Sequence, residues 1–170
     1  MESVVLIPAP GVGQLVHDLR MQYDPSAAAG IPPHVTLMFP FLPPSDLTEA
    51  TIDSLERLIG ATRAFQFSLT GVKQFEQGVV YLEPEPAEPF ARLTREISRR
   101  FGILPFGGEF ADTPVTHLTV ATRGSASARK QLVNQLGDVV PIVVRAKEGW
   151  LVVGTNAGAW NIVRSMRLRD

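Results

Sequence analysis

A four-residue phrase, histidine, aliphatic residue, threonine, aliphatic residue, occurs twice in this chain of 170 residues. It reads His-Val-Thr-Leu at 34–37 and His-Leu-Thr-Val at 117–120, and it contains two of the three histidines. From rough residue frequencies, two of three histidines would fall into this phrase by chance on the order of once in ten thousand sequences. The repeat therefore predicts a chain of two related halves, each with one histidine-bearing strand.

Each copy of the phrase has the alternation of a β-strand. Residues two apart on a strand point to the same face, so His34 projects beside Thr36 and His117 beside Thr119. The aliphatic residues between them face the opposite side. If a pseudo-twofold axis relates the two halves, both polar faces turn toward one central groove. Two imidazoles and two hydroxyls around one small volume would form a symmetric site for a single phosphate.

These four side chains suit the hydrolysis of a cyclic phosphodiester. The reaction needs a base for the proton of the attacking water and an acid for the departing sugar oxygen, and histidine serves in either role near neutral pH. Threonine hydroxyls can hydrogen-bond the non-bridging phosphate oxygens, whose charge must be held as phosphorus becomes five-coordinate. We therefore predict His34, His117, Thr36 and Thr119 as catalytic residues of a reaction that uses no cofactor.

Two other interpretations of the histidines compete with this one. A single histidine on a strand is more often a hydrogen-bonded structural residue than a catalyst, and threonine is common in strands for its branched shape alone. The duplication weighs against that interpretation, although two widely separated imidazoles would restore it. A metal site is the second alternative, but the motifs offer two ligands and no acidic residue at a ligand-like position. We therefore predict no metal site.

Hydrophobic periodicity and turn residues divide the rest of the chain into strands and helices. Both halves follow the order strand, helix, histidine strand, helix, strands, with equivalent elements about 75 to 83 residues apart. We expect strands at 3–7, 34–39, 64–72, 78–82, 115–122, 139–147, 150–153 and 160–166, and helices at 11–23, 47–59, 90–101 and 125–136. This order predicts an α+β fold with mostly antiparallel sheets. We expect one domain, residues 1–170, with two lobes around a central cleft and helices packed outside.

The composition restricts the possible partners. The chain has no cysteine, which excludes disulfides, thiolate metal sites and cysteine nucleophiles. Its formal net charge of −1 argues against binding of long nucleic acids through their phosphates. The N-terminus lacks a basic start followed by a long apolar run, and no segment has the length of a membrane span. We expect a soluble cytoplasmic protein with no membrane partner.

Longer stretches around the motifs resemble a known superfamily. Pro-Pro-His-Val-Thr-Leu-Met-Phe-Pro-Phe at 32–41, Tyr-Leu-Glu-Pro-Glu-Pro at 81–86 and Thr-His-Leu-Thr-Val-Ala at 116–121 resemble the 2'-5' RNA ligase-like branch of the two-histidine phosphoesterases. The resemblance implies a bilobal fold and enzymes that open 2',3'-cyclic phosphates or related cyclic nucleotides, some of which join RNA ends through a 2'-5' bond. It implies that His34 and His117 form the acid–base pair. We expect a monomer that acts on a small cyclic nucleotide or an RNA terminus.

Two further residues are candidates for substrate binding. Many relatives place a basic residue shortly after the second motif, and here Arg123 shares strand parity with His117 if the strand continues that far. Phe106, in the glycine-rich loop before the second motif, could stack on a base at the rim of the cleft, with packing as its alternative role. Phe39 and Phe41 have the opposite parity to His34, and we expect both in the core.

A nucleotide-binding or RNA-end-binding module without catalytic activity is the alternative function. The residues that would catalyse the reaction would also hold a phosphate, so the motifs alone do not separate the two functions. Turnover of a 2',3'-cyclic nucleotide separates them, because only an enzyme consumes it. The near-symmetry of the motifs also leaves open which histidine is the acid and which is the base.

Overall fold

The strands of the computed structural model, which describes residues 1–108 and 115–170, form two four-stranded sheets. The strands are β1 Glu2–Pro8, β2 His34–Met38, β3 Phe65–Gln74, β4 Val80–Glu85, β5 Leu118–Ala121, β6 Ile142–Ala146, β7 Glu148–Gly154 and β8 Trp160–Arg167. Their order is β2-β1-β7-β8 in the first sheet and β5-β4-β3-β6 in the second. All neighbouring strands in these sheets are antiparallel. The expected α+β class is confirmed.

Five α-helices lie in the described residues, and their ends follow from local chemistry. They are α1 Gln14–Tyr23, α2 Pro25–Ala28, α3 Glu49–Gly60, α4 Glu88–Phe101 and α5 Ala126–Gly137. The hydroxyls of Thr48 and Ser125 accept backbone N–H groups in the first turns of α3 and α5. Gly102, in the left-handed region with φ 68°, ends α4. None of these helices is long and apolar enough to cross a membrane.

Several boundaries differ from the expected ones. The helix expected at 11–23 is divided into a 3-10 turn, Pro10–Val12, and α1, because Gly13 between them has a φ of 91° that interrupts a helix. The strand expected at 115–122 is shorter, since β5 begins only at Leu118. In contrast, β4 continues through Pro84. Since β5 pairs with β4 only as far as Leu82, proline lies where one edge of β4 is free.

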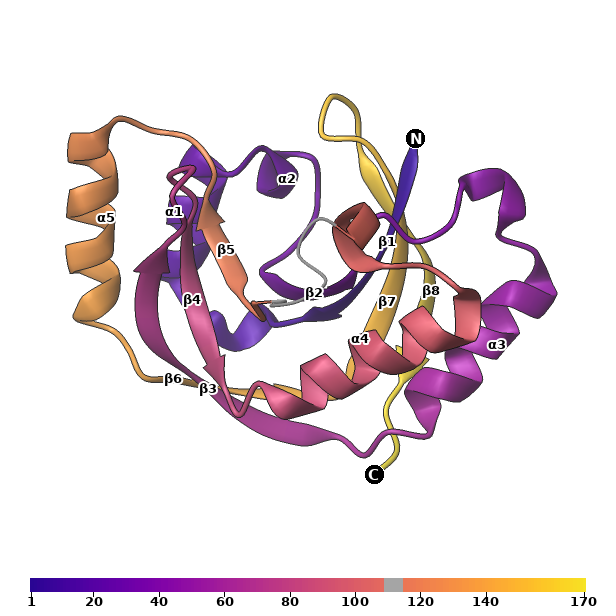
Figure 1. Cartoon of the computed structure of the whole chain (residues 1–170). Coiled ribbons are helices and arrows are strands. Elements are labelled where there is room, and N and C mark those ends of the chain that lie inside the picture. The colour runs from indigo at the N-terminus through magenta and orange to yellow at the C-terminus, as the bar shows by residue number, and fades with distance from the viewer. Residues whose placement is uncertain (109–114) are drawn as a thin grey trace.

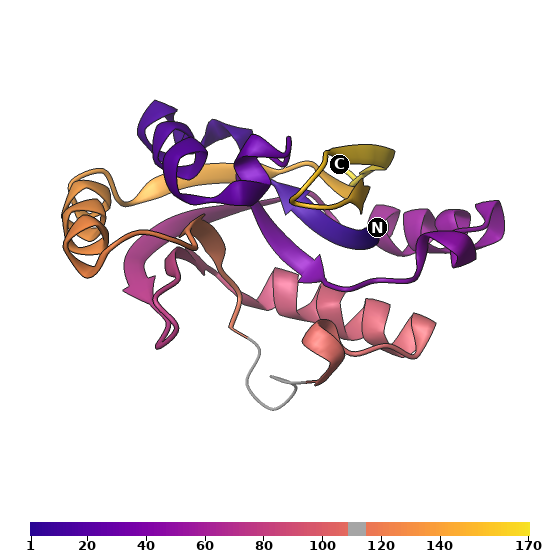
Figure 2. The same cartoon turned by 90° about the horizontal axis from the view of Figure 1, so that it is seen from above.

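The two sheets share one core, and each half of the chain covers the other half's histidine strand. Helix α1, which follows β1, contacts β5, and α4, which follows β4, contacts β2. The main hydrophobic cluster joins Ile7 and Val35 of the first sheet to Leu82 and Leu118 of the second. Helices α5 and α3 lie at opposite ends of the molecule (Figures 1 and 2). This exchange of helices brings the two histidine strands together.

Candidate active site

The two histidine strands lie side by side although they belong to different sheets. Strand β2 contacts β5, and each is the edge strand of its own sheet. His34 is the first residue of β2, and His117 directly precedes β5. The histidine and threonine side chains of both motifs are half-buried, whereas the aliphatic residues between and after them are buried. The polar positions therefore share one face of each strand, and the aliphatic positions pack into the core.

Each motif has the same irregularity in strand pairing at its last residue. Leu6 pairs with Thr36 and Val5 with Met38, so Leu37 is left without an opposite residue. In the second sheet Tyr81 pairs with Thr119 and Val80 with Ala121, and Val120 is left in the same way. A β-bulge lets two successive side chains turn to the same side of a strand. The duplicated sequence phrase thus corresponds to a duplicated backbone feature.

Both imidazoles are held by the same kind of hydrogen bond. Nδ1 of His34 lies 2.8 Å from the carbonyl oxygen of Pro32, and Nδ1 of His117 lies 2.6 Å from that of Val115. In each case the partner is the carbonyl two residues earlier in the chain. A carbonyl oxygen only accepts, so Nδ1 carries the proton in both rings and Nε2 keeps its lone pair in the neutral form. Nε2 is therefore the atom of each ring that can take up a proton.

A cavity of about 340 Å³ lies beside the motifs. It is lined by Thr36, Leu37, Phe39, Phe75, Gln77, Val79, Ala91, Thr94, Pro105, Phe106, Val115, Thr116, His117, Thr119 and Thr122. These residues are aromatic, aliphatic or neutral polar, and no lysine, arginine or carboxylate is among them. His34 is not part of this lining, although it shares the face of β2 with Thr36. A cavity of this kind suits a ligand with a large uncharged part and few charges.

Two phenylalanines form one wall of the cavity. The rings of Phe39 and Phe106 meet edge to face with their centroids 6.2 Å apart, and the Phe106 amide donates to the Phe39 carbonyl. Phe106 thus lies at the cavity, as its candidate role requires. Phe39 does not lie in the main core: it is half-buried and packs against the smaller hydrophobic cluster that contains Leu6. The bulge after Thr36 buries both Leu37 and Met38 and shifts the alternation by one residue. Phe41, in contrast, is buried as expected.

Arg123 does not share the strand face of His117. Strand β5 ends at Ala121, so the alternation that would align the two side chains stops before Arg123. The Arg123 guanidinium donates to the carbonyl oxygen of Gln22 at 3.2 Å, near the end of α1. The structure thus places Arg123 against α1 and outside the cavity lining.

Two aromatic residues that the sequence did not single out contact His117. The rings of Phe75 and Tyr81 lie 5.1 and 5.5 Å from the imidazole, between centroids, in edge-to-face geometry. Phe75 and Tyr81 also stack on each other at 4.2 Å. Tyr81 reaches His117 because it pairs with Thr119 across the sheet. Only the strand register reveals this contact.

The surroundings of His34 differ from those of His117. Burial in the protein, followed by the nearby positive charge of Arg20, lowers the pKa of His34 from 6.5 to about 4. The charge of His117 also acts weakly on His34, so the two imidazoles are near enough to influence each other. Burial lowers the pKa of His117, and the hydrogen bond to Val115 opposes this effect. Among the described residues, no three histidine or acidic side chains are grouped so as to hold a metal ion.

Comparison with known proteins places these features in a family. The model of the 2'-5' RNA ligase superfamily matches residues 8–158, which include both motifs and the strands that carry them. The chain belongs to this superfamily. The resemblance noted from the two motifs is confirmed.

Individual proteins that resemble this chain share less than 30% of its residues. A Bacillus cytotoxicus protein named "Putative phosphoesterase" is 28% identical over 136 residues, which cover 79% of this chain and 76% of the relative. The crystal structure of Escherichia coli LigT complexed with 3'-AMP has a TM-score of 0.62 at 17% identity and covers 99% of this chain and 98% of LigT. A Thermus thermophilus protein, TT0787, reaches 0.61 at 17% identity, with coverage of 99% and 98%. The fold is therefore that of LigT.

The low pKa of His34 predicts an acid-sensitive fold. Unfolded histidine binds a proton below pH 6.5, whereas folded His34 stays neutral down to about pH 4, so the unfolded state binds more protons in this window. The free energy of unfolding should therefore fall as the pH decreases from 6.5 to 4, by about 3 kcal/mol from His34 alone. In His34→Asn, whose amide can still donate to Pro32, this contribution should be missing. Urea denaturation at several pH values measures how the free energy of unfolding changes with pH in the wild type and in His34→Asn. The same change in both proteins would contradict the prediction.

Proposed function

We propose that this protein is a metal-independent phosphodiesterase that opens 2',3'-cyclic phosphates by acid–base catalysis with His34 and His117. The main support is the equivalent arrangement of the two imidazoles, which are both fixed through Nδ1 and both able to exchange a proton at Nε2. One such ring would accept a proton, and the other would donate one. Membership of the 2'-5' RNA ligase superfamily and relatives named as phosphoesterases agree with this chemistry.

In the proposed reaction, a water molecule attacks the phosphorus atom of the cyclic phosphate. One imidazole takes the proton of that water, and the other gives its proton to the sugar oxygen that departs. Thr36 and Thr119, on the same faces as the histidines, would donate hydrogen bonds to the non-bridging oxygens while phosphorus is five-coordinate. The products are a ring-opened phosphomonoester and two histidines that regain their starting states by exchange with solvent.

A related activity uses the same groups. If the 5'-hydroxyl of a second RNA end attacks the cyclic phosphate in place of water, the product is a phosphodiester bond between the ends. When the 3'-oxygen departs, that bond is a 2'-5' linkage. The described lining of the cavity contains no lysine or arginine that could bind several phosphates, which favours a small substrate over a long RNA.

The nucleotide part of the substrate would occupy the aromatic side of the cavity. Phe39, Phe75 and Phe106 line it, and aromatic rings stack on bases with little dependence on sequence. Structures of E. coli LigT, which has the same fold, have been solved with 3'-AMP, NADP+ and ATP. We propose Phe106 as a substrate-binding residue on these grounds.

A substrate screen in the presence of a chelator tests this function. We expect the purified protein to hydrolyse a 2',3'-cyclic mononucleotide with a rate that EDTA does not change, because the site supplies its own acid, base and phosphate donors. ADP-ribose cyclic phosphate and 2'-5'-linked dinucleotides complete the screen, with products separated by chromatography. Loss of activity in EDTA that a divalent ion restores would contradict the proposal. Tight binding of the cyclic nucleotide without turnover would favour the non-catalytic binding module.

A further inference from the structure

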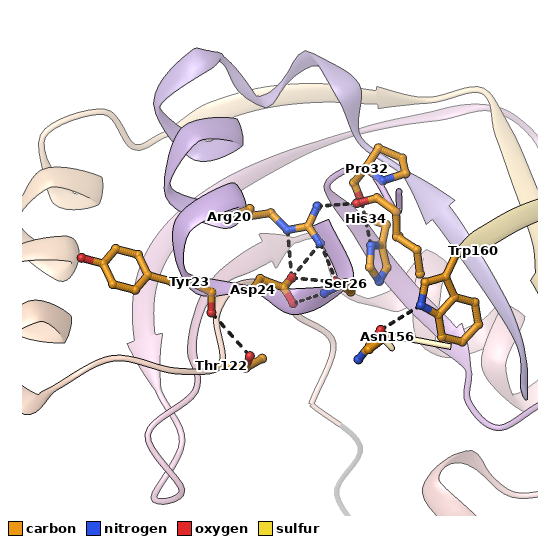
Figure 3. Close-up of polar contacts among 10 residues, drawn as sticks. Arg20, Tyr23, Asp24, Ser26, Pro32, His34, Thr122, Asn156 and Trp160 are labelled. Atoms are coloured by element: carbon orange, nitrogen blue, oxygen red, sulfur yellow. Dashed lines mark hydrogen bonds and ion pairs between the residues drawn. The ribbon is translucent and has the colours of Figure 1, made fainter. Parts of the chain in front are cut away.

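A buried ion pair lies beside His34. Arg20 lies in the last turn of α1, and Asp24 is the first residue after that helix. The two residues are 1% and 3% exposed. Nε and Nη2 of Arg20 donate to one carboxylate oxygen of Asp24 at 3.2 and 2.7 Å (Figure 3). Buried charges are costly unless they are paired and hydrogen-bonded, so a pair at this position indicates a specific role.

The ion pair contacts the segment from Ser26 to Pro32, and the Pro32 carbonyl at its end is the hydrogen-bond partner of His34. Nη1 of Arg20 donates to the carbonyl oxygen of Ile31 at 3.0 Å, and the next carbonyl, that of Pro32, accepts from Nδ1 of His34. Asp24 accepts from the amide and the hydroxyl of Ser26, which begins the same segment. The position of the Pro32 carbonyl, and with it the orientation of the His34 ring, therefore depends on Arg20 and Asp24.

Among residues 1–108 and 115–170, no equivalent of this ion pair lies beside His117. The Val115 carbonyl that holds its ring belongs to a residue that is 48% exposed, and its ring neighbours are Phe75 and Tyr81. In the described residues, the charges that act on His34 are those of Arg20, Asp24 and His117, and the Arg20 charge has the largest effect of the three. In the part of the chain that the structure describes, Tyr81 is the titratable side chain in ring contact with His117. The charge environment is therefore asymmetric although the motifs are not.

We propose that Arg20 and Asp24 are positioning residues that orient His34 and keep it neutral, so that His117 is the first of the two imidazoles to take up a proton. Burial disfavours the charged form of His34 most strongly, and the Arg20 guanidinium adds repulsion of a second positive charge. The Asp24 carboxylate compensates for only part of this repulsion. This inference rests on the proposed function for its catalytic meaning. A histidine that stays neutral is suited to take the proton of the attacking water, and one that is protonated first is suited to give its proton to the sugar oxygen.

Titration of the imidazoles by nuclear magnetic resonance tests the proposal on the whole protein. The ring signals of His34 and His117 are assigned by their absence from His34→Asn and His117→Asn. In the wild type, with and without inorganic phosphate, we expect His117 to protonate at a higher pH than His34. Protonation of His34 first would overturn the proposal.

Two variants with opposite expected effects separate an electrostatic role from a merely structural one. Arg20→Met/Asp24→Asn removes both charges and leaves no unpaired buried charge, so the midpoint of the His34 titration should move to a higher pH. Asp24→Asn alone leaves the Arg20 charge uncompensated, so less His34 should be protonated at pH 4.5 than in the wild type. If the substitutions merely loosened the segment, the His34 midpoint would move in the same direction in both variants. That result would refute the electrostatic role of the pair. An unchanged His34 midpoint in the folded double variant would refute it as well.

A control variant and a rate measurement complete the experiment. Arg164 forms ion pairs with Glu49 and Glu56 on the side of α3, and Arg164→Met should leave both imidazole midpoints unchanged. If the protein hydrolyses a cyclic nucleotide, kcat/KM can be measured as a function of pH. In the double variant the acidic limb of this profile should shift to higher pH together with the His34 midpoint, while the basic limb stays where it is. The titration order needs no turnover, so a failed substrate screen would reject the proposed function without deciding the role of Arg20 and Asp24.

Discussion

Replacement of His34 or His117 by alanine is expected to lower the turnover of the best cyclic phosphodiester by about 10² to 10⁴, the usual contribution of a general acid or base. Each ring is fixed through Nδ1 and can exchange a proton at Nε2, so its removal leaves no group in place to move that proton. The double variant should be little slower than the slower single variant, because residues that act as a unit are strongly non-additive. Initial rates on the best substrate of the screen measure all three variants.

The threonines provide the matched control for the histidine variants. Thr36→Val and Thr119→Val keep the shape of the side chain and remove one hydroxyl, so each should lose less activity than the histidine variant of the same strand. Circular dichroism establishes that each variant is folded. Near-wild-type turnover in folded His34→Ala or His117→Ala would refute acid–base catalysis by the pair. If only one of the two alanine variants lost turnover, the motif with the other histidine would have a binding role and no catalytic one.

Replacement of Phe90 by alanine is expected to destabilise the fold by about 3 to 5 kcal/mol, the usual cost of removing a buried phenylalanine. Phe90 is 1% exposed, and it meets Phe65 at 5.1 Å and Phe67 at 5.0 Å between ring centroids, both edge to face. Pairs of this geometry add to the stabilisation that burial provides. Phe90 thereby holds α4 against β3, and α4 carries Ala91 and Thr94 to the cavity. The variant should therefore also lose activity as the temperature rises.

Urea denaturation of the wild type, Phe90→Ala and Phe106→Ala measures how much each substitution lowers the free energy of unfolding. Phe106 is 39% exposed at the cavity, so its replacement should change the free energy of unfolding much less than that of Phe90. If Phe106 binds the base, Phe106→Ala should instead raise KM. A loss below 1 kcal/mol in Phe90→Ala would show that the aromatic cluster contributes little to stability.

Periodicity predicted the main strands and helices with small boundary errors. Strand β2 and helix α5 were expected at 34–39 and 125–136, and they lie at His34–Met38 and Ala126–Gly137. Such elements follow from patterns within a few residues, namely alternation, caps and turn residues. The short helix α2 was not predicted, since its stability depends on Asp24, whose carboxylate accepts the Ser26 amide while Arg20 neutralises its charge. With only four residues, α2 is also too short to show the helical periodicity from which the longer helices were predicted.

The candidate site was predicted in part, and the limit has a physical cause. The duplicated phrase led to the histidines and threonines, because residue type and strand parity are both local properties. Phe39 was assigned to the wrong face, since a bulge arises from pairing with another strand and a strand read alone does not show it. Arg123 was aligned with His117 on the assumption of a longer strand, and β5 ends at Ala121.

The sequence by itself determined that the chain has two related halves, which residues carry the polar faces, and which family the chain belongs to. The tertiary structure decided what surrounds each histidine. Phe75 and Tyr81 beside His117, and the ion pair of Arg20 and Asp24 beside His34, lie far from the motifs or outside them, and they reach the rings through strand register and helix packing. Two motifs of the same pattern therefore acquire different charges around them, because a pKa depends on burial and neighbouring charges that only the folded chain brings together.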